Sequence, residues 1–172
     1  MSDLELIETD RLVLSGWRMD QIDDLVRLHG DPIVARYLAG DGSPWTMEQM
    51  TKALAHWIDL FERQQMGKLR VRRKADGVLV GRAGFGVHGP DEIPEIGYAL
   101  YPEFWGNGYA FEAASALRDW YWRATDRDHF LGMAFVANEP SRKVLRRIGM
   151  IETHQEPEDG RMLQFHILRR PR

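Results

Sequence analysis

The stretch from Pro94 to Ala114, PEIGYALYPEFWGNGYAFEAA, constrains the fold of this chain more than any other segment. Apolar residues alternate with small or polar ones over residues 95–101, which predicts a strand. Gly106 and Gly108 then permit backbone angles and close approaches that a side chain would forbid. From Ala110 onward the apolar residues recur at helical spacing. The segment therefore predicts a strand, a short glycine turn and a helix that starts at the second glycine.

A glycine turn that leads into a helix directs several backbone N–H groups without intrahelical partners toward one point, where a phosphate can bind. Two other interpretations remain open from these residues. The segment could be a plain strand-to-helix turn, or it could be a dinucleotide-binding loop. A Gly-x-Gly-x-x-Gly loop would place its third glycine at Phe111, however, and no acidic ribose-binding residue follows at the expected distance.

The hexapeptide at residues 105–110, WGNGYA, resembles the pyrophosphate-binding loop of the GNAT acetyltransferases, usually written Gln/Arg-x-x-Gly-x-Gly/Ala. Gly108 and Ala110 occupy the small positions of that loop, whereas Trp105 replaces the usual first residue. With this replacement and EIGY at residues 95–98, the segment is similar to that of the RimJ/RimL-like branch, which acetylates the N-termini of ribosomal proteins.

The resemblance implies that acetyl-coenzyme A is the acetyl donor and that backbone N–H groups of the glycine loop hold its diphosphate. It also implies that the pantetheine arm pairs with the strand around residues 98–100 and meets an Asn-x-x-Ser segment, here Asn138 to Ser141. In that arrangement a backbone N–H near Leu100 would polarise the thioester carbonyl. The cofactor-binding residues expected on this basis are Tyr98, Ala99, Leu100, Trp105, Gly106, Asn107, Gly108, Tyr109, Ala110, Asn138 and Ser141.

Three residues are candidates for acid–base work in such a reaction. Amines are largely protonated near neutral pH, so a carboxylate at Glu95 could remove a proton from the acceptor. It could equally hold an ammonium group by charge, or be an exposed strand residue. By resemblance, Ser141 would protonate the departing thiolate, with Tyr98 as the rival donor.

The sequence indicates the residues that would bind the acceptor less clearly. Tyr37, Trp45 and Phe85, with Glu95, are the expected substrate-binding residues. Trp17 and Trp57 are further aromatic residues that could line a pocket. Aromatic residues at such spacing are also typical of a core, so this part of the prediction stays ambiguous.

The patterns along the chain predict a strand, helices, three strands, a helix, a strand, a helix and two strands, an order that indicates a mixed α/β fold with a partly antiparallel sheet. The resemblance implies a single GNAT domain over residues 1–172, with a twisted, mostly antiparallel sheet of about seven strands, splayed at the cofactor site and flanked by helices. The strands are expected at residues 5–16, 69–74, 78–87, 95–101, 130–136, 151–154 and 163–168.

Composition narrows the functional classes. The 172 residues carry a formal charge of −3, which gives no electrostatic reason to expect nucleic-acid binding. The absence of cysteine excludes disulfides and a cysteine nucleophile. No apolar run reaches membrane-spanning length and the acidic start is unlike a secretory signal, so we expect a cytoplasmic protein with no membrane partner. The six histidines lack metal-ligand spacing, so no metal is expected.

The sequence therefore predicts an N-acetyltransferase that moves an acetyl group from acetyl-coenzyme A directly to a primary amine. The resemblance favours the α-amine of a protein N-terminus, with a small-molecule amine or amino acid as the alternative acceptor. Two other classes stay open: a catalytically silent acetyl-coenzyme A sensor, and association with RNA or ribosomes, for which the charge supplies no basic face. Similar proteins are commonly dimers, and the residues neither require nor exclude a homodimer.

Overall fold

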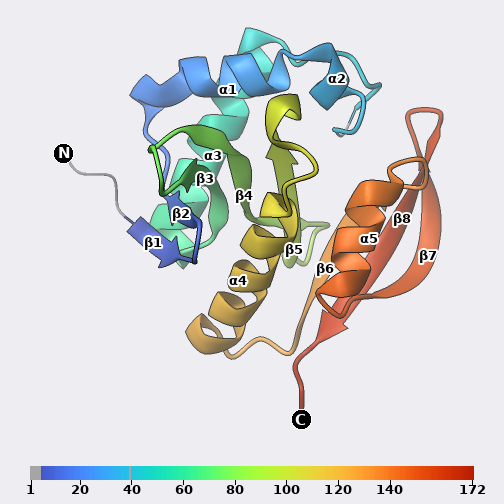
Figure 1. The fold of residues 1–172 in the computed structure, drawn as a ribbon. Coiled ribbons are helices and arrows are strands. Elements are labelled where there is room, and N and C mark those ends of the chain that lie inside the picture. Colours follow the sequence, from blue (N-terminus) through green and yellow to red (C-terminus); the bar gives the residue numbers. More distant parts are fainter. Residues whose placement is uncertain (1–4, 39) are drawn as a thin grey trace.

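Eight strands form one sheet in the order β1-β2-β3-β4-β5-β6-β8-β7 in the computed structural model, which describes residues 5–38 and 40–172 (Figure 1). The strands are β1 Glu5–Glu8, β2 Leu12–Ser15, β3 Gly67–Arg73, β4 Leu79–His88, β5 Ile93–Leu100, β6 His129–Phe135, β7 Ile151–Glu158 and β8 Arg161–Arg169. All neighbours are antiparallel except β5 and β6, which run parallel. The predicted mixed α/β class, with a mostly antiparallel sheet, is confirmed.

The sheet has one strand more than the sequence predicts, because residues 5–16 form a hairpin in place of a single strand. Thr9 produces the reversal. Its backbone N–H donates to the carbonyl of Leu12 at 2.9 Å, and its hydroxyl oxygen accepts from the N–H of Leu12 at 2.9 Å. A polar side chain that pairs with nearby backbone in this way competes with continued extension of the strand.

In the described part of the chain, five α-helices accompany the sheet. They are α1 Ile22–His29, α2 Pro32–Ala35, α3 Met47–Gln64, α4 Tyr109–Ala124 and α5 Glu139–Arg147. Helix α3 begins at a capping box, in which the Thr46 side chain accepts from the N–H of Gln49 and the Gln49 side chain accepts in return. Helix α4 begins directly after Gly108, as the glycine turn predicts.

Side chains alternate between the two faces of a strand, so the residues of β5 on one face pack against different helices from those on the other. Ile96 packs in one cluster with Leu117 and Tyr121 of α4. Ala99 packs in another cluster, with Leu28 of α1 and with Leu38. The central strand therefore separates a compartment on the α4 side from one on the α1 and α2 side (Figure 1).

The sheet opens next to β5. Strands β5 and β6 are paired only at Glu95 with Leu131 and at Ile96 with Gly132. From Gly97 to Leu100, β5 remains paired with β4 on its other side. The predicted splay in the sheet is therefore present, and it lies immediately after Ile96.

Candidate active site

A cavity of about 650 Å³ occupies the place where β5 and β6 part. Tyr98, Phe111 and Ser141 line it on the side of α4 and α5, whereas Lys68 and Trp57 line it on the side of α1 and α3. Because these groups belong to opposite faces of the sheet, the cavity connects the two faces through the splay. Two reactants that approach from opposite faces can meet there.

The glycine turn forms one end of this cavity. Gly106 and Gly108 both have φ of +78°, in the left-handed region that favours glycine. Gly108 is the N-cap of α4, and no side chain caps the helix there. A Cβ on Gly106 would meet no atom within 4 Å, and one on Gly108 would meet only Arg11, at 3.5 Å. The first N–H groups of α4 are thus open to an anion.

Contacts on the outer side hold the turn in shape. The Asn107 side chain donates to the carbonyls of Phe104 at 3.0 Å and Trp105 at 3.2 Å. Arg11 donates to the carbonyl of Asn107 at 3.0 Å and forms an ion pair with Glu112 at 2.7 Å. The conformation of the turn is therefore fixed by side chains that leave its inner surface unobstructed.

Strand β5 presents backbone groups to the opening in the sheet. Tyr101 donates its N–H to Val80 of β4 at 3.0 Å. Because these groups alternate along an antiparallel strand, the N–H and C=O of Tyr98 and Leu100 point away from β4 and toward the splay. The carbonyl of Leu100 accepts from the Trp105 indole at 2.9 Å. The side chain of Ala99 points to the opposite face from those of Tyr98 and Leu100, so it lines the cavity on the side of α1 and α2.

Tyr98 and Ser141 form a reciprocal pair. The Ser141 hydroxyl donates to the Tyr98 oxygen at 3.1 Å, and the Tyr98 hydroxyl donates to the Ser141 carbonyl at 2.9 Å. Burial raises the pKa of the Tyr98 phenol well above its usual value, so it stays protonated at neutral pH. Asn138 is the N-cap of α5, where its side chain accepts from the Ser141 N–H at 3.4 Å. All three residues line the cavity.

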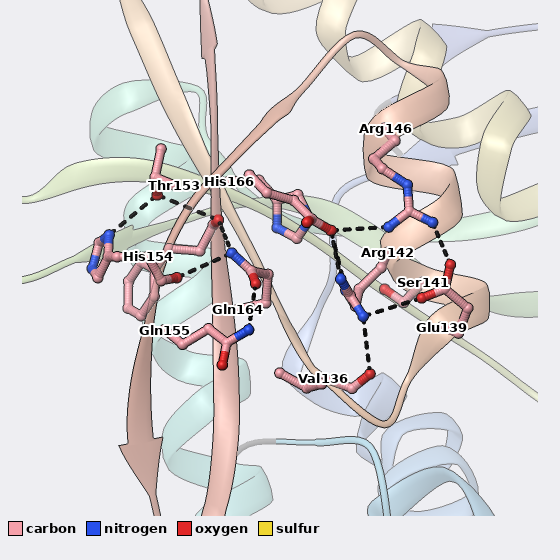
Figure 2. Close-up of polar contacts among 12 residues, drawn as sticks. Val136, Glu139, Ser141, Arg142, Arg146, Thr153, His154, Gln155, Gln164 and His166 are labelled. Atoms are coloured by element: carbon pink, nitrogen blue, oxygen red, sulfur yellow. Dashed lines mark hydrogen bonds and ion pairs between the residues drawn. The ribbon is translucent and has the colours of Figure 1, made fainter.

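Helix α5 is held in place by charges on its outer side (Figure 2). Arg142 and Arg146 both donate to the carboxylate of Glu152 on β7, at 2.7 and 2.9 Å. Arg142 also donates to the carbonyl of Val136 at 3.3 Å, and Arg146 pairs with Glu139. This network anchors the helix that carries Ser141 to the C-terminal hairpin.

On the opposite face of the sheet, Glu95 is paired with a buried lysine that the sequence analysis missed. The Lys68 Nζ lies 3.5 Å from Glu95 Oε2 and donates to the carbonyl of Gly84 at 3.2 Å. Lys68, Gly84 and Gly97 are in register across β3, β4 and β5. A Cβ on Gly97 would lie only 2.6 Å from Nζ, so the glycines give Lys68 the room to lie flat across the sheet.

The charge of Lys68 is strongly influenced by its surroundings. Burial lowers the pKa of its ammonium from 10.5 to about 8, against the attraction of Glu95, which raises it. Lys68 is therefore charged at neutral pH and loses its proton within the range in which enzymes operate. No local sequence signal marks this lysine, because its burial depends on glycines in two other strands.

Arg82 of β4 is a second buried cation on the same wall. Its Nε donates to His29 Nε2 at 3.0 Å, and its guanidinium lies over the Trp57 ring, 5.1 Å from the centroid. Burial lowers the pKa of His29 to about 2, with the nearby Arg82 charge as a further cause, so His29 is neutral. Burial also lowers the pKa of Arg82 to about 10, which leaves it charged at neutral pH.

The expected aromatic residues divide into two groups. Tyr37 and Trp45 line the cavity, as does Trp57. Phe85 does not: it is 1% exposed and packs against Tyr121 and Phe130, with ring centroids 4.7 and 5.2 Å away. The prediction for Phe85 is therefore corrected. It is paired with Ile96 across β4 and β5 and shares its orientation toward α4, away from the face that carries Lys68 and Glu95.

Within residues 5–38 and 40–172, no cluster of three or more histidine, aspartate or glutamate side chains is arranged to hold a metal ion. No helix in that described part of the chain is both long and apolar enough to cross a membrane.

Comparison with known proteins points to one family. A family model described as an acetyltransferase (GNAT) domain matches residues 11–151. An uncharacterised N-acetyltransferase of Bacillus licheniformis, p20, is 25% identical over 171 residues, which cover 95% of this chain and 94% of the relative.

Solved structures agree. An acetyltransferase from Agrobacterium tumefaciens has a TM-score of 0.82 and 26% identity, with 99% of this chain and 96% of that one covered. The RimL ribosomal L7/L12 α-N-protein acetyltransferase in complex with coenzyme A has a TM-score of 0.78, with 94% of this chain and 95% of that one covered. Because the two sequences are only 19% identical, this match shows a similarity of fold alone.

Proposed function

The chain belongs to the GNAT family of acetyltransferases, and from that premise we propose that it transfers an acetyl group from acetyl-coenzyme A directly to a primary amine. The observation that carries this proposal is the cavity that passes through the sheet at the splay, with an open helix N-terminus on one face and Glu95 on the other. In this proposal, residues 1–172 form a single domain.

The residues on the α4 side fit acetyl-coenzyme A. Its diphosphate requires several N–H donors, which the turn around Gly106 and Gly108 offers without a blocking side chain. Its pantetheine amides require an exposed strand edge, which Tyr98 and Leu100 offer at the splay. Asn138 and Ser141 line the same passage. The complex of the RimL enzyme with coenzyme A supports this assignment.

When bound, acetyl-coenzyme A supplies the acetyl thioester, and the residues of the chain supply orientation and proton transfer. The acceptor nitrogen forms a bond to the acetyl carbon, the carbon–sulfur bond breaks, and the amine gives up one proton while the thiolate gains one. Glu95 takes or attracts the amine proton, and Ser141 or Tyr98 protonates the sulfur. Much of the acceleration comes from holding the two reactants in line.

We further propose that the acceptor is the α-amine of a peptide or protein, or else a small amine or amino acid. The fold of the RimL enzyme favours the peptide. The part of the cavity surface lined by Trp45, Trp57, Lys68, Arg82 and Glu95 is the acceptor wall in this proposal, and its two indole rings favour the small molecule.

The proposal is tested with a panel of acceptors. Acetyl-coenzyme A should raise the melting temperature, and coenzyme A thiol should be released with at least one class among free N-terminal peptides, N-terminally blocked lysine peptides, amino acids and simple amines. Stabilisation without thiol release from any amine would identify a silent acetyl-coenzyme A-binding protein instead.

Glu95→Gln tests the proton-transfer part of the proposal. The variant should lower kcat at neutral pH, with partial recovery as the pH rises and more of the amine becomes neutral. Glu62→Gln, an exposed carboxylate on α3, is the matched control and should leave the rate unchanged. An unaltered rate and pH profile in Glu95→Gln would remove Glu95 from the mechanism.

A further inference from the structure

Two buried cations lie on the acceptor wall of the cavity. Lys68 is 7% exposed and Arg82 is 6% exposed, and both line the cavity. Glu95 lies beside Lys68, and the more exposed Glu156 and Glu158 line the cavity from β7. His29 is neutral, because burial holds its pKa near 2.

Arg82 is the buried cation on this wall that has no carboxylate at ion-pair distance among the described residues. It donates to His29 and lies over Trp57. The charge of Glu95 reaches it from farther away and raises its pKa, against the larger effect of burial. Its two terminal nitrogens make no hydrogen bond to any described residue and are not sealed from the cavity. They are hydrogen-bond donors available at the cavity surface.

The neighbouring arginine shows what a compensated site on this sheet looks like. Arg70 is directly opposite Arg82 in the pairing of β3 with β4. Arg70 forms an ion pair with Asp24 of α1 at 2.8 Å, and it does not line the cavity. Among the described residues, the chain thus provides a carboxylate at ion-pair distance for Arg70 and none at that distance for Arg82.

A buried guanidinium without a counter-ion is costly, whereas a carboxylate that pairs with it in a water-poor site binds strongly. The His29 acceptor fixes one side of the Arg82 group and the Trp57 ring supports its face. The remaining planar edge has the geometry that recognises the two oxygens of a carboxylate.

We propose that Arg82 is the anion-binding subsite of the acceptor pocket and that the acceptor carries a carboxylate in addition to its amine. This inference rests on the proposed acetyl transfer, which places the amine near Glu95. Arg82 is opposite Ala99, four residues along β5 from Glu95, or about 13 Å of strand. Side chains that reach into the cavity from both positions shorten this span, as the influence of Glu95 on the Arg82 pKa indicates. We therefore place the carboxylate on the same residue as the amine or on the residue next to it.

The test compares acceptors that differ only by a carboxylate and its carboxamide. The pairs are alanine with alaninamide, aspartic acid α-amide with asparagine α-amide, glutamic acid α-amide with glutamine α-amide, and Ala-Asp with Ala-Asn peptide amides. In at least one pair the carboxylate member should have a kcat/KM roughly tenfold or more higher, the effect expected of a charge-assisted hydrogen bond.

Arg82→Met should bring that ratio close to one, and Arg82→Lys, which keeps the charge but loses the planar edge, should leave an intermediate ratio. Acetyl-coenzyme A affinity and melting temperature check that both variants fold. Arg70→Met is the matched control and should keep the wild-type ratio, because Arg70 does not line the cavity. Ratios below about threefold in every pair, or a ratio that survives Arg82→Met, would overturn the assignment.

A second measurement does not need turnover. The N-acetylated products of the same pairs are titrated calorimetrically into protein saturated with coenzyme A, and the carboxylate product should bind roughly tenfold tighter in wild type but not in Arg82→Met. Equal affinities, or no binding by any product, would overturn the subsite. Thiol release from no amine at all would count against the proposed function, and the titration would then decide the subsite alone.

Discussion

The buried Lys68 ammonium should produce a measurable dependence of stability on pH, which the substitution Lys68→Met should remove. In the folded protein burial lowers the pKa of Lys68 from 10.5 to about 8. Between these two values the unfolded chain binds more protons than the folded one, so the free energy of unfolding rises with pH across this window. The sign is opposite to that of a lysine stabilised by an ion pair, because here desolvation outweighs the attraction of Glu95.

The magnitude follows from the size of the shift. A difference of one pKa unit corresponds to about 1.4 kcal/mol, so the full shift makes the protonated form about 3 kcal/mol less favourable in the folded state. Between about pH 7 and pH 9.5 most of this cost disappears, which should raise the free energy of unfolding by about 2 kcal/mol. Arg82 and the buried tyrosines titrate at higher pH and remain in the variant, so a difference between the two proteins isolates Lys68.

Urea denaturation at a series of pH values measures this directly. The wild-type free energy of unfolding should rise over the window relative to that of Lys68→Met by about 2 kcal/mol. Lys52→Met, an exposed lysine on α3 that pairs with Glu48, is the control and should follow wild type. Parallel curves for wild type and Lys68→Met would refute the reasoning, since they would mean that Lys68 ionises alike in both states.

Three other substitutions address the rest of the site. Gly108→Val should raise the Kd for acetyl-coenzyme A by about tenfold or more, because a β-branched residue at φ +78° is strained and adds a side chain beside the N–H groups. Gly77→Val, in a left-handed turn that does not line the cavity, should leave the Kd unchanged, and equal effects would deny the loop its role. Gly97→Ala places a Cβ 2.6 Å from Lys68 Nζ, so kcat should fall while acetyl-coenzyme A affinity is kept; an unchanged kcat would make the position of Lys68 irrelevant. Tyr98→Phe should lower kcat more than it weakens acetyl-coenzyme A binding, and a loss confined to binding would remove the phenol from proton transfer.

The local parts of the fold could be read from the sequence. The glycine turn, the start of α4 at Gly108 and the capping box at Thr46 depend on residues within a few positions of one another. The hairpin at Thr9 was missed because both of its strands are short and their apolar patterns run together. Local chemistry was therefore sufficient to predict the glycine turn and the helix that follows it, and insufficient for the edge of the sheet.

The acceptor wall could not be read from the sequence, because it depends on register between distant strands. Lys68 is buried only because Gly84 and Gly97 are opposite it in the next two strands. Phe85 faces α4 because of its pairing with Ile96, and nothing in its neighbours along the chain states which face that is. The charges that face the acceptor follow from the pairing of the whole sheet.

The account depends most on the placement of a diphosphate at the start of α4. A crystal structure of the protein with coenzyme A measures this most directly. We predict that the diphosphate oxygens lie within hydrogen-bond distance of backbone N–H groups between Gly106 and Phe111, with the pantetheine arm along β5 toward Ser141. A diphosphate bound elsewhere, with the turn at Gly108 contacting only solvent, would contradict the account.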